Sequence, residues 1–81
     1  MILYEDPKIS RYKSRLKKVR LLRKLTQEEL SEIAGVNLKS LSAYEQNPEK
    51  LNQAAVKTVH QLADALNCEI DDILNQETLK D

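Results

Sequence analysis

The sequence predicts an all-α fold, a single compact domain with five helices. The chain has 81 residues with no Trp or Phe, one Gly and two Pro, and it is rich in residues that favour helices over strands. Its apolar residues recur at helical spacing in several short stretches. We expect a core over about residues 10–75, with flexible residues before it and a flexible tail at 76–81. A core this small is marginal unless the helices pack it efficiently or a second chain helps, so an oligomer is plausible.

The first expected helix starts near Asp6-Pro7, where Asp can cap and Pro suits the first position, or near Ser10, and it runs to about Lys24. One stripe of this helix is apolar and the other faces are basic. The apolar stripe consists of Ile9, Tyr12, Leu16, Val19 and Leu22 or Arg23.

The second expected helix begins after Thr26, since Thr26 and Glu29 have the spacing of a capping box, and it ends at Gly35. Its buried face is expected to be Leu30, Ile33 and Ala34. Asn37 is a good N-cap for a third helix over Leu38 to about Gln46, with Leu41 and Tyr44 or Glu45 pointing inward.

The segment "NPEKLN" is interpreted as a polar connection. Asn52 can then cap a fourth helix, which ends at Asn67, a residue that tolerates the left-handed conformation. The fourth helix has the clearest apolar stripe, formed by Val56, Val59, Leu62, Ala63 and Leu66. "CEIDDIL" is expected to be a short fifth helix whose Ile70, Ile73 and Leu74 close the core.

The two ends of the chain differ in charge although the net charge is zero. Residues 1–24 carry nine basic and two acidic groups, giving +7, and the remainder carries four basic and eleven acidic groups, giving −7. This distribution fits a basic face turned toward phosphates, but a solvated basic helix explains it equally well.

Several classes of protein are not expected. The chain has one His and one Cys, so it has few side chains that could form a catalytic or metal site. We therefore predict neither an enzyme nor a cofactor. His60 is expected to be structural or exposed, and Cys68 to be a buried thiol. The N-terminus "MILYEDPKIS" does not resemble a signal peptide, and no apolar run is long enough to span a bilayer. We therefore expect a cytoplasmic protein with no membrane partner.

The segment "LTQEELSEIAGVNLKSLSAYE" pairs two helices, each too short to be stable alone, around one glycine. With Arg20 before it and "LADALNCEIDDIL" after it, it resembles the phage-repressor and Cro-type helix-turn-helix family, the XRE-like transcriptional regulators, over roughly residues 15–75. The resemblance implies a lambda-repressor-like domain, of bacterial or phage origin, whose third helix enters the DNA major groove. The chain departs from the family at Lys24, where members often have glycine. We therefore expect the first helix to end without a left-handed residue.

The resemblance also assigns residues to DNA. The start of the third helix would meet the bases through Asn37, Leu38, Lys39, Ser42 and Ala43. For Asn37, a role as N-cap alone is at least as well supported. Gln27 resembles the family's phosphate-contacting glutamine. Further candidates for phosphate contacts are Arg11, Arg15, Lys18 and Lys50, each of which is also compatible with a simple surface charge.

The family pairs an arginine of the first helix with the glutamate that ends the recognition helix, and the matching residues here are Arg20 and Glu45. We expect this ion pair at the edge of the core, where it would fix the recognition helix on the domain. The predicted function is a sequence-specific transcriptional regulator that binds double-stranded DNA as a homodimer. The alternative is an antitoxin, or another regulator on the same fold, that binds a protein partner such as a toxin.

Overall fold

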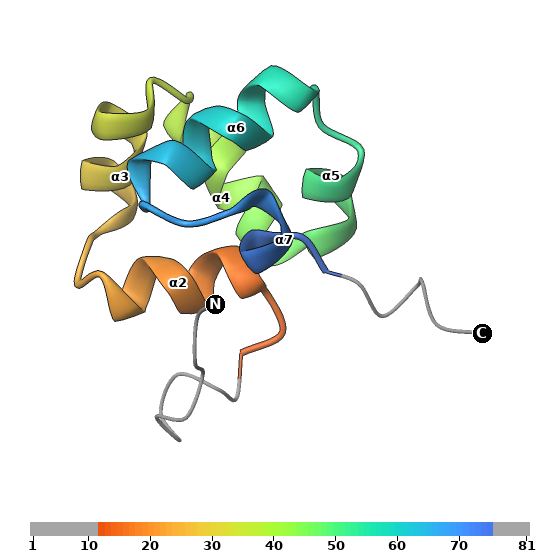
Figure 1. Ribbon diagram of the computed structural model, residues 1–81, viewed down its shortest axis with the longest axis horizontal. Coiled ribbons are helices and arrows are strands. Elements are labelled where there is room, and N and C mark those ends of the chain that lie inside the picture. The colour runs from red at the N-terminus through yellow and green to blue at the C-terminus, as the bar shows by residue number, and fades with distance from the viewer. Residues whose placement is uncertain (1–11, 76–81) are drawn as a thin grey trace.

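The computed structural model of the chain describes residues 12–75, and this part consists of six helices without a strand (Figure 1). The all-α prediction is confirmed, with one short helix more than expected. The helices are α2 (Arg15–Leu22), α3 (Gln27–Ala34), α4 (Leu38–Gln46), α5 (Pro48–Asn52), α6 (Val56–Ala65) and α7 (Ile70–Ile73). None of the helices in this part of the chain is long and apolar enough to cross a membrane.

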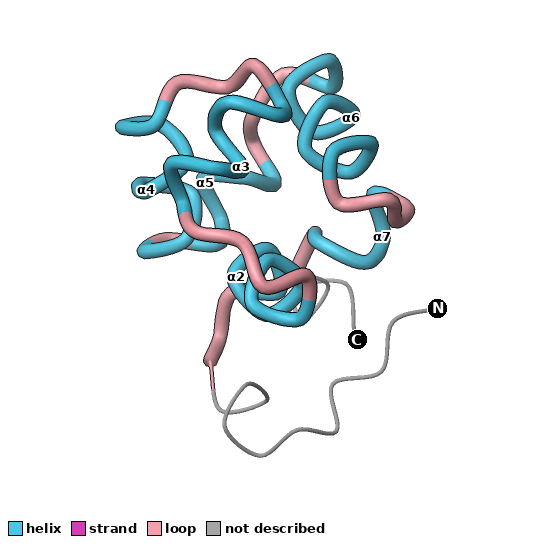
Figure 2. The backbone as a smooth tube through the Cα atoms, turned by 90° about the vertical axis from the view of Figure 1, so that its left-hand side faces the viewer, coloured by secondary structure: helices cyan, strands magenta, loops and turns pink. Residues whose placement is uncertain are grey.

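The helices surround one core. Helix α3 packs against α4 and α6, α5 packs against α4, and α2 contacts both α4 and α7. Figure 2 shows α2 nearly end-on, below the layer that α3, α4 and α5 form, with α7 beside it. The side chains at the centre are almost fully buried, and the largest are Leu16, Leu30, Leu41, Leu51, Leu62, Leu66, Ile73 and Val19.

Helix α2 begins later than predicted. Ser14 is its N-cap, because the Lys17 backbone N–H donates to Ser14 Oγ at 3.0 Å, and residues 12–14 are not helical. The prediction of a continuous helix from Asp6-Pro7 or Ser10 to Lys24 is therefore wrong. The proposed start sites themselves, together with Ile9 and Arg11, lie outside the described residues.

The turn after α2 contains Lys24 in the left-handed conformation, with φ of 60°. The prediction that this helix would end without a left-handed residue is wrong. The fold keeps the backbone geometry that glycine adopts freely, and a lysine takes it at a conformational cost. Asn67, in the turn after α6, has φ of 55°, which confirms the left-handed conformation predicted for it.

Helix α3 has the predicted ends. Thr26 and Glu29 form a reciprocal capping box, with both hydrogen bonds between 2.8 and 3.0 Å, and Gly35 is a left-handed C-cap. Leu30 and Ala34 are buried as predicted, but Ile33 is 59% exposed. The assignment of Ile33 to the buried face was wrong because so short a helix buries only a narrow stripe against α4 and α6.

The predicted polar connection "NPEKLN" is instead helix α5. Asn47 caps it, Pro48 occupies its first position, and Leu51 is buried in the core. As a result Asn52 ends α5 and does not cap α6, which starts after Ala55 without a side-chain cap. Val56 is 69% exposed and does not join the buried stripe, which starts at Val59.

Candidate nucleic-acid interface

The angle between α3 and α4 is fixed by a tight, hydrogen-bonded turn. The backbone N–H groups of Gly35 and Val36 both donate to Ser31 O, and Ser31 Oγ donates to Val36 O at 2.6 Å. Val36 is buried, and Leu41 anchors α4 in the core. The two short helices therefore form one rigid corner.

The N-terminal half of α4 presents the residues predicted to read bases. Asn37 Oδ1 accepts from the backbone N–H groups of Lys39 (2.8 Å) and Ser40 (3.2 Å), so the Asn37 side chain is an N-cap. Leu38 and Lys39 are exposed. Ser42 and Ala43 are half-buried and lie one helical turn further along, so they continue the faces that start at Leu38 and Lys39.

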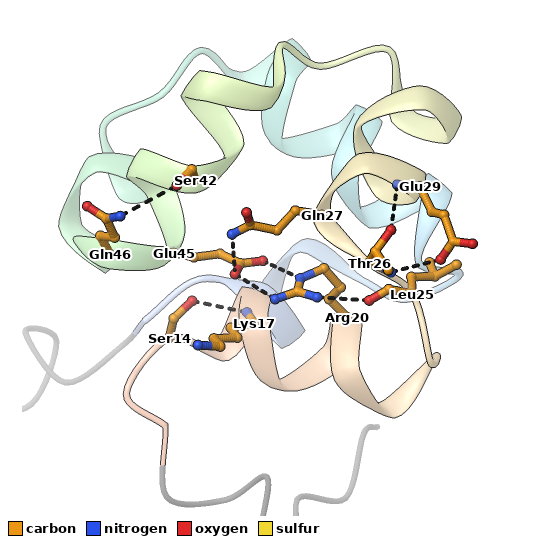
Figure 3. A network of polar contacts seen from close by, with 10 residues as sticks. All are labelled: Ser14, Lys17, Arg20, Leu25, Thr26, Gln27, Glu29, Ser42, Glu45 and Gln46. Atoms are coloured by element: carbon orange, nitrogen blue, oxygen red, sulfur yellow. Dashed lines mark hydrogen bonds and ion pairs between the residues drawn. The ribbon is translucent and has the colours of Figure 1, made fainter.

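At the other end of α4, Glu45 lies in a buried polar network with Arg20 of α2 (Figure 3). Arg20 Nε donates to Glu45 Oε2 at 2.7 Å, and Arg20 Nη2 donates to Glu45 Oε1 at 2.9 Å. The two side chains are 8% and 3% exposed. Arg20 Nη1 also donates to Leu25 O at 2.8 Å, which ties the turn after α2 to the pair. The predicted partners are thus joined in a bidentate, nearly dry ion pair.

A comparison with protein-family models identifies the family to which the chain belongs. The family model described as "Helix-turn-helix" matches residues 16–73, most of the chain. The chain belongs to the helix-turn-helix family. This is a family of DNA-binding regulators of the XRE-like, Cro type. No curated protein and no solved structure matched the chain.

The candidates for phosphate contacts in this helix-turn-helix protein have different surroundings. Gln27, the first residue of α3, is half-buried and donates through Nε2 to Glu45 Oε1 at 3.0 Å. Lys18 is half-buried on α2, and Lys50 is exposed on α5, which directly follows α4. Arg11 lies outside the described residues.

The fifth candidate, Arg15, is bound to the C-terminal part of the chain. Its Nη1 donates to Asp71 O at 3.2 Å and to Leu74 O at 3.4 Å, at the end of α7. Arg23 does the same for α6, with Nε donating to Leu66 O at 2.7 Å and Nη2 to Asn67 O at 3.2 Å. Carbonyl groups at helix C-termini carry partial negative charge and lack intrahelical hydrogen-bond donors. An arginine side chain supplies both a compensating positive charge and the missing donors.

The role of Arg23 was not anticipated from the sequence. Nothing in the local spacing marks an arginine for a helix end more than 40 residues away. The contact follows only from the packing of α2 beneath the rest of the domain. Arg15 and Arg20 of α2, together with its C-cap residue Arg23, therefore hold the domain together, and the basic character of this segment is partly structural.

Asn75 was also missed. Its side chain accepts from the Arg15 backbone N–H at 3.4 Å and donates to Lys13 O at 3.2 Å. Its backbone exchanges two hydrogen bonds with the Asn52 side chain, of 2.9 and 3.3 Å. The segment after α7 is thereby fastened to the entrance of α2 and to the end of α5.

The remaining polar candidates have ordinary environments. His60 is exposed on α6. Cys68 is only half-buried, and burial, followed by the nearby Asp72 carboxylate, raises the pKa of its thiol to about 11. Among the described residues, no group of three or more His, Cys, Asp or Glu side chains is placed to hold a metal ion.

Proposed function

We propose that the chain is a sequence-specific transcriptional regulator that reads the DNA major groove with α4. The observation that carries the proposal is the exposure of Leu38 and Lys39 at the start of α4, which forms a rigid corner with α3. Lys39 supplies a cation suited to guanine, while Leu38 and Ala43 supply apolar contacts suited to a thymine methyl group. Asn37 uses its oxygen to cap α4, so in this role only its amide group is left to meet a base.

Phosphate contacts would flank the reading helix. Gln27 at the start of α3 and Lys50 on α5 lie in the elements on either side of α4 in sequence. Lys18 and Arg15 on α2 are further candidates, with Arg15 sharing its guanidinium with the end of α7. These contacts would set the register of α4 without reading sequence.

A domain of this size contacts only one half-site, so we propose a symmetric dimer on a pseudo-palindromic site. The segment Asn67–Leu74, which includes α7, is the proposed surface for pairing. Half-sites would then lie about one helical turn, roughly 34 Å, apart.

A second function is favoured by the apolar residue at the start of α4. Leu38 is 39% exposed, and a partly apolar recognition surface suits a protein partner as well as DNA. On this alternative the chain is an antitoxin or a related regulator, with DNA binding secondary.

Selection of bound sequences from a random pool of double-stranded DNA separates the two functions. Enrichment of a two-fold symmetric motif is the expected result for the regulator. Enrichment of no motif, from folded protein at low salt, would contradict the regulator and favour the partner-binding alternative.

A further inference from the structure

The Glu45 carboxylate has a third donor besides the two N–H groups of Arg20. Gln27 Nε2 donates to Glu45 Oε1 at 3.0 Å, and this is the same oxygen that accepts from Arg20 Nη2 at 2.9 Å. One carboxylate therefore joins α2, α3 and α4. Within residues 12–75, no buried side-chain nitrogen or oxygen lacks a hydrogen-bond partner.

This contact determines which way the Gln27 amide points. An ionised carboxylate only accepts hydrogen bonds, so the NH₂ group of Gln27 must face Glu45 and the carbonyl oxygen must face away. Figure 3 shows the amide nitrogen turned toward Glu45 and the amide oxygen turned from it. The NH₂ group has two hydrogens and uses one of them here, which leaves the second as a donor.

Two further features make this position suitable for a phosphate. Gln27 is the first residue of α3, where backbone N–H groups have no acceptor within the helix and the helix dipole favours an anion. A carboxylate so close would normally repel a phosphate, but Arg20 neutralises Glu45 through two hydrogen bonds. The ion pair removes the repulsion and leaves the orienting acceptor in place.

We infer that Glu45 is a positioning residue, which holds the Gln27 amide so that its second N–H meets one phosphate of the DNA backbone. The inference rests on the proposed function. Because Glu45 belongs to α4, the carboxylate that fixes the reading helix on Arg20 also aims the phosphate contact. Backbone contact and base reading are thereby held in one register.

The test uses DNA in which single phosphates of the selected site are replaced by uncharged methylphosphonate groups. For the parent, one position per half-site should weaken binding roughly tenfold, because a hydrogen bond to a charged group is lost there. Gln27→Ala should bind unmodified DNA roughly tenfold more weakly and lose much less than the parent at that position, because only the backbone N–H groups at the start of α3 still face the phosphate. Gln53→Ala, which removes an exposed glutamine after α5, is the matched control and should keep the profile of the parent.

Glu45→Gln tests the positioning role directly, at a temperature where circular dichroism shows it folded. It should lose most of the effect of the methylphosphonate at the Gln27 position and keep the effects at other positions. If Glu45→Gln does not fold, a measurement on the parent protein alone tests the positioning role. The two side-chain amide protons of Gln27 should respond differently to DNA in ¹⁵N–¹H spectra, with only the outward one shifting strongly.

The outcomes distinguish this inference from the proposed function. A parent protein that selects no DNA sequence contradicts the function. A parent that binds selected DNA while Gln27→Ala shows an unchanged methylphosphonate profile overturns the phosphate contact alone. Retention of the Gln27 effect in folded Glu45→Gln, or equal shifts of both amide protons, overturns the positioning role.

Discussion

Removal of one partner of the Arg20–Glu45 pair should destabilise the domain strongly. In Arg20→Met the carboxylate of Glu45, whose side chain is only 3% exposed, would lose both guanidinium donors and keep Gln27 alone. In Glu45→Gln the Arg20 guanidinium would stay buried opposite a neutral amide whose NH₂ group cannot accept. Both changes leave a charge in a site from which water is largely excluded.

The size of the effect follows from this burial. Breaking a buried pair by removing one partner costs about 3–5 kcal/mol, whereas an exposed pair contributes about 0–1 kcal/mol. Domains have roughly 0.05–0.15 kcal/mol of stability per residue, or about 4–12 kcal/mol for a chain of 81 residues. Each single variant would thus lose a large share of the total. At about 4–8 °C per kcal/mol, the Tm should fall by at least about 12 °C.

Urea and thermal denaturation followed by circular dichroism measure this loss. Lys57→Met and Glu32→Gln change exposed charges on α6 and α3 and are matched controls, expected to shift stability by less than about 0.5 kcal/mol. The double variant Arg20→Met/Glu45→Leu replaces both partners with apolar groups and should be less destabilised than either single variant. If both single variants unfold within about 1 kcal/mol of the parent, the pair does not hold α4 on the domain.

Four other expectations concern DNA binding, assembly and pH. Plots of log K against log salt should be steep, with about 0.9 per neutralised phosphate, and Lys18→Ala and Arg15→Ala should weaken binding to all sequences alike; a flat plot would contradict the basic-face argument. Lys39→Ala should cost about 1–3 kcal/mol at one base position, measured by competition with single-base variants of the site, and a uniform loss would reassign Lys39 to a phosphate. Sedimentation on DNA should show two copies per site, and substitutions in Asn67–Leu74 should weaken pairing; a strict monomer at high concentration would contradict the dimer. Because the pKa of Cys68 rises from 9.0 to about 11 on folding, its stabilising contribution is complete below pH 9 and is lost as pH rises toward 11, so Cys68→Ala should flatten the decline in urea midpoints over that range.

Local signals in the sequence predicted most of the helix ends near the site. The capping box at Thr26, the left-handed Gly35 and the cap at Asn37 each depend on residues within one helical turn. Such signals act before any tertiary contact forms, so they can be recognised without the fold. The partnership of Arg20 with Glu45 was available only from the family resemblance, since 25 residues separate the two.

The errors arose where long-range packing decides the outcome. The segment "NPEKLN" is helical because Leu51 is buried in the core, although the composition of the segment suits a loop. Val56 and Ile33 fit apolar stripes by spacing but are 69% and 59% exposed, because each lies off the narrow stripe that its helix buries. Arg20 O accepts from the backbone N–H groups of Arg23 and Leu25, which flank Lys24, and Arg20 Nη1 donates to Leu25 O. These hydrogen bonds hold the turn between α2 and α3, so Lys24 takes a φ that glycine adopts more easily.

The hydrogen bonds of Asn75 hold the last residue of the described range beside its first residues. They bring residue 75 against residues 13–15, so the two limits of the described chain meet at one corner. If residues 1–11 and 76–81 were removed, a short peptide linker could join residue 12 to residue 75 and turn the backbone into a ring, which could then be opened elsewhere. The turn at residues 53–55 between α5 and α6, in which Gln53 and Ala55 are exposed, is a suitable place to cut, because it lies outside the α3–α4 corner. A circular permutant of this kind would have its new ends away from the α3–α4 corner. Tags or fused domains could be attached there without lying next to α2.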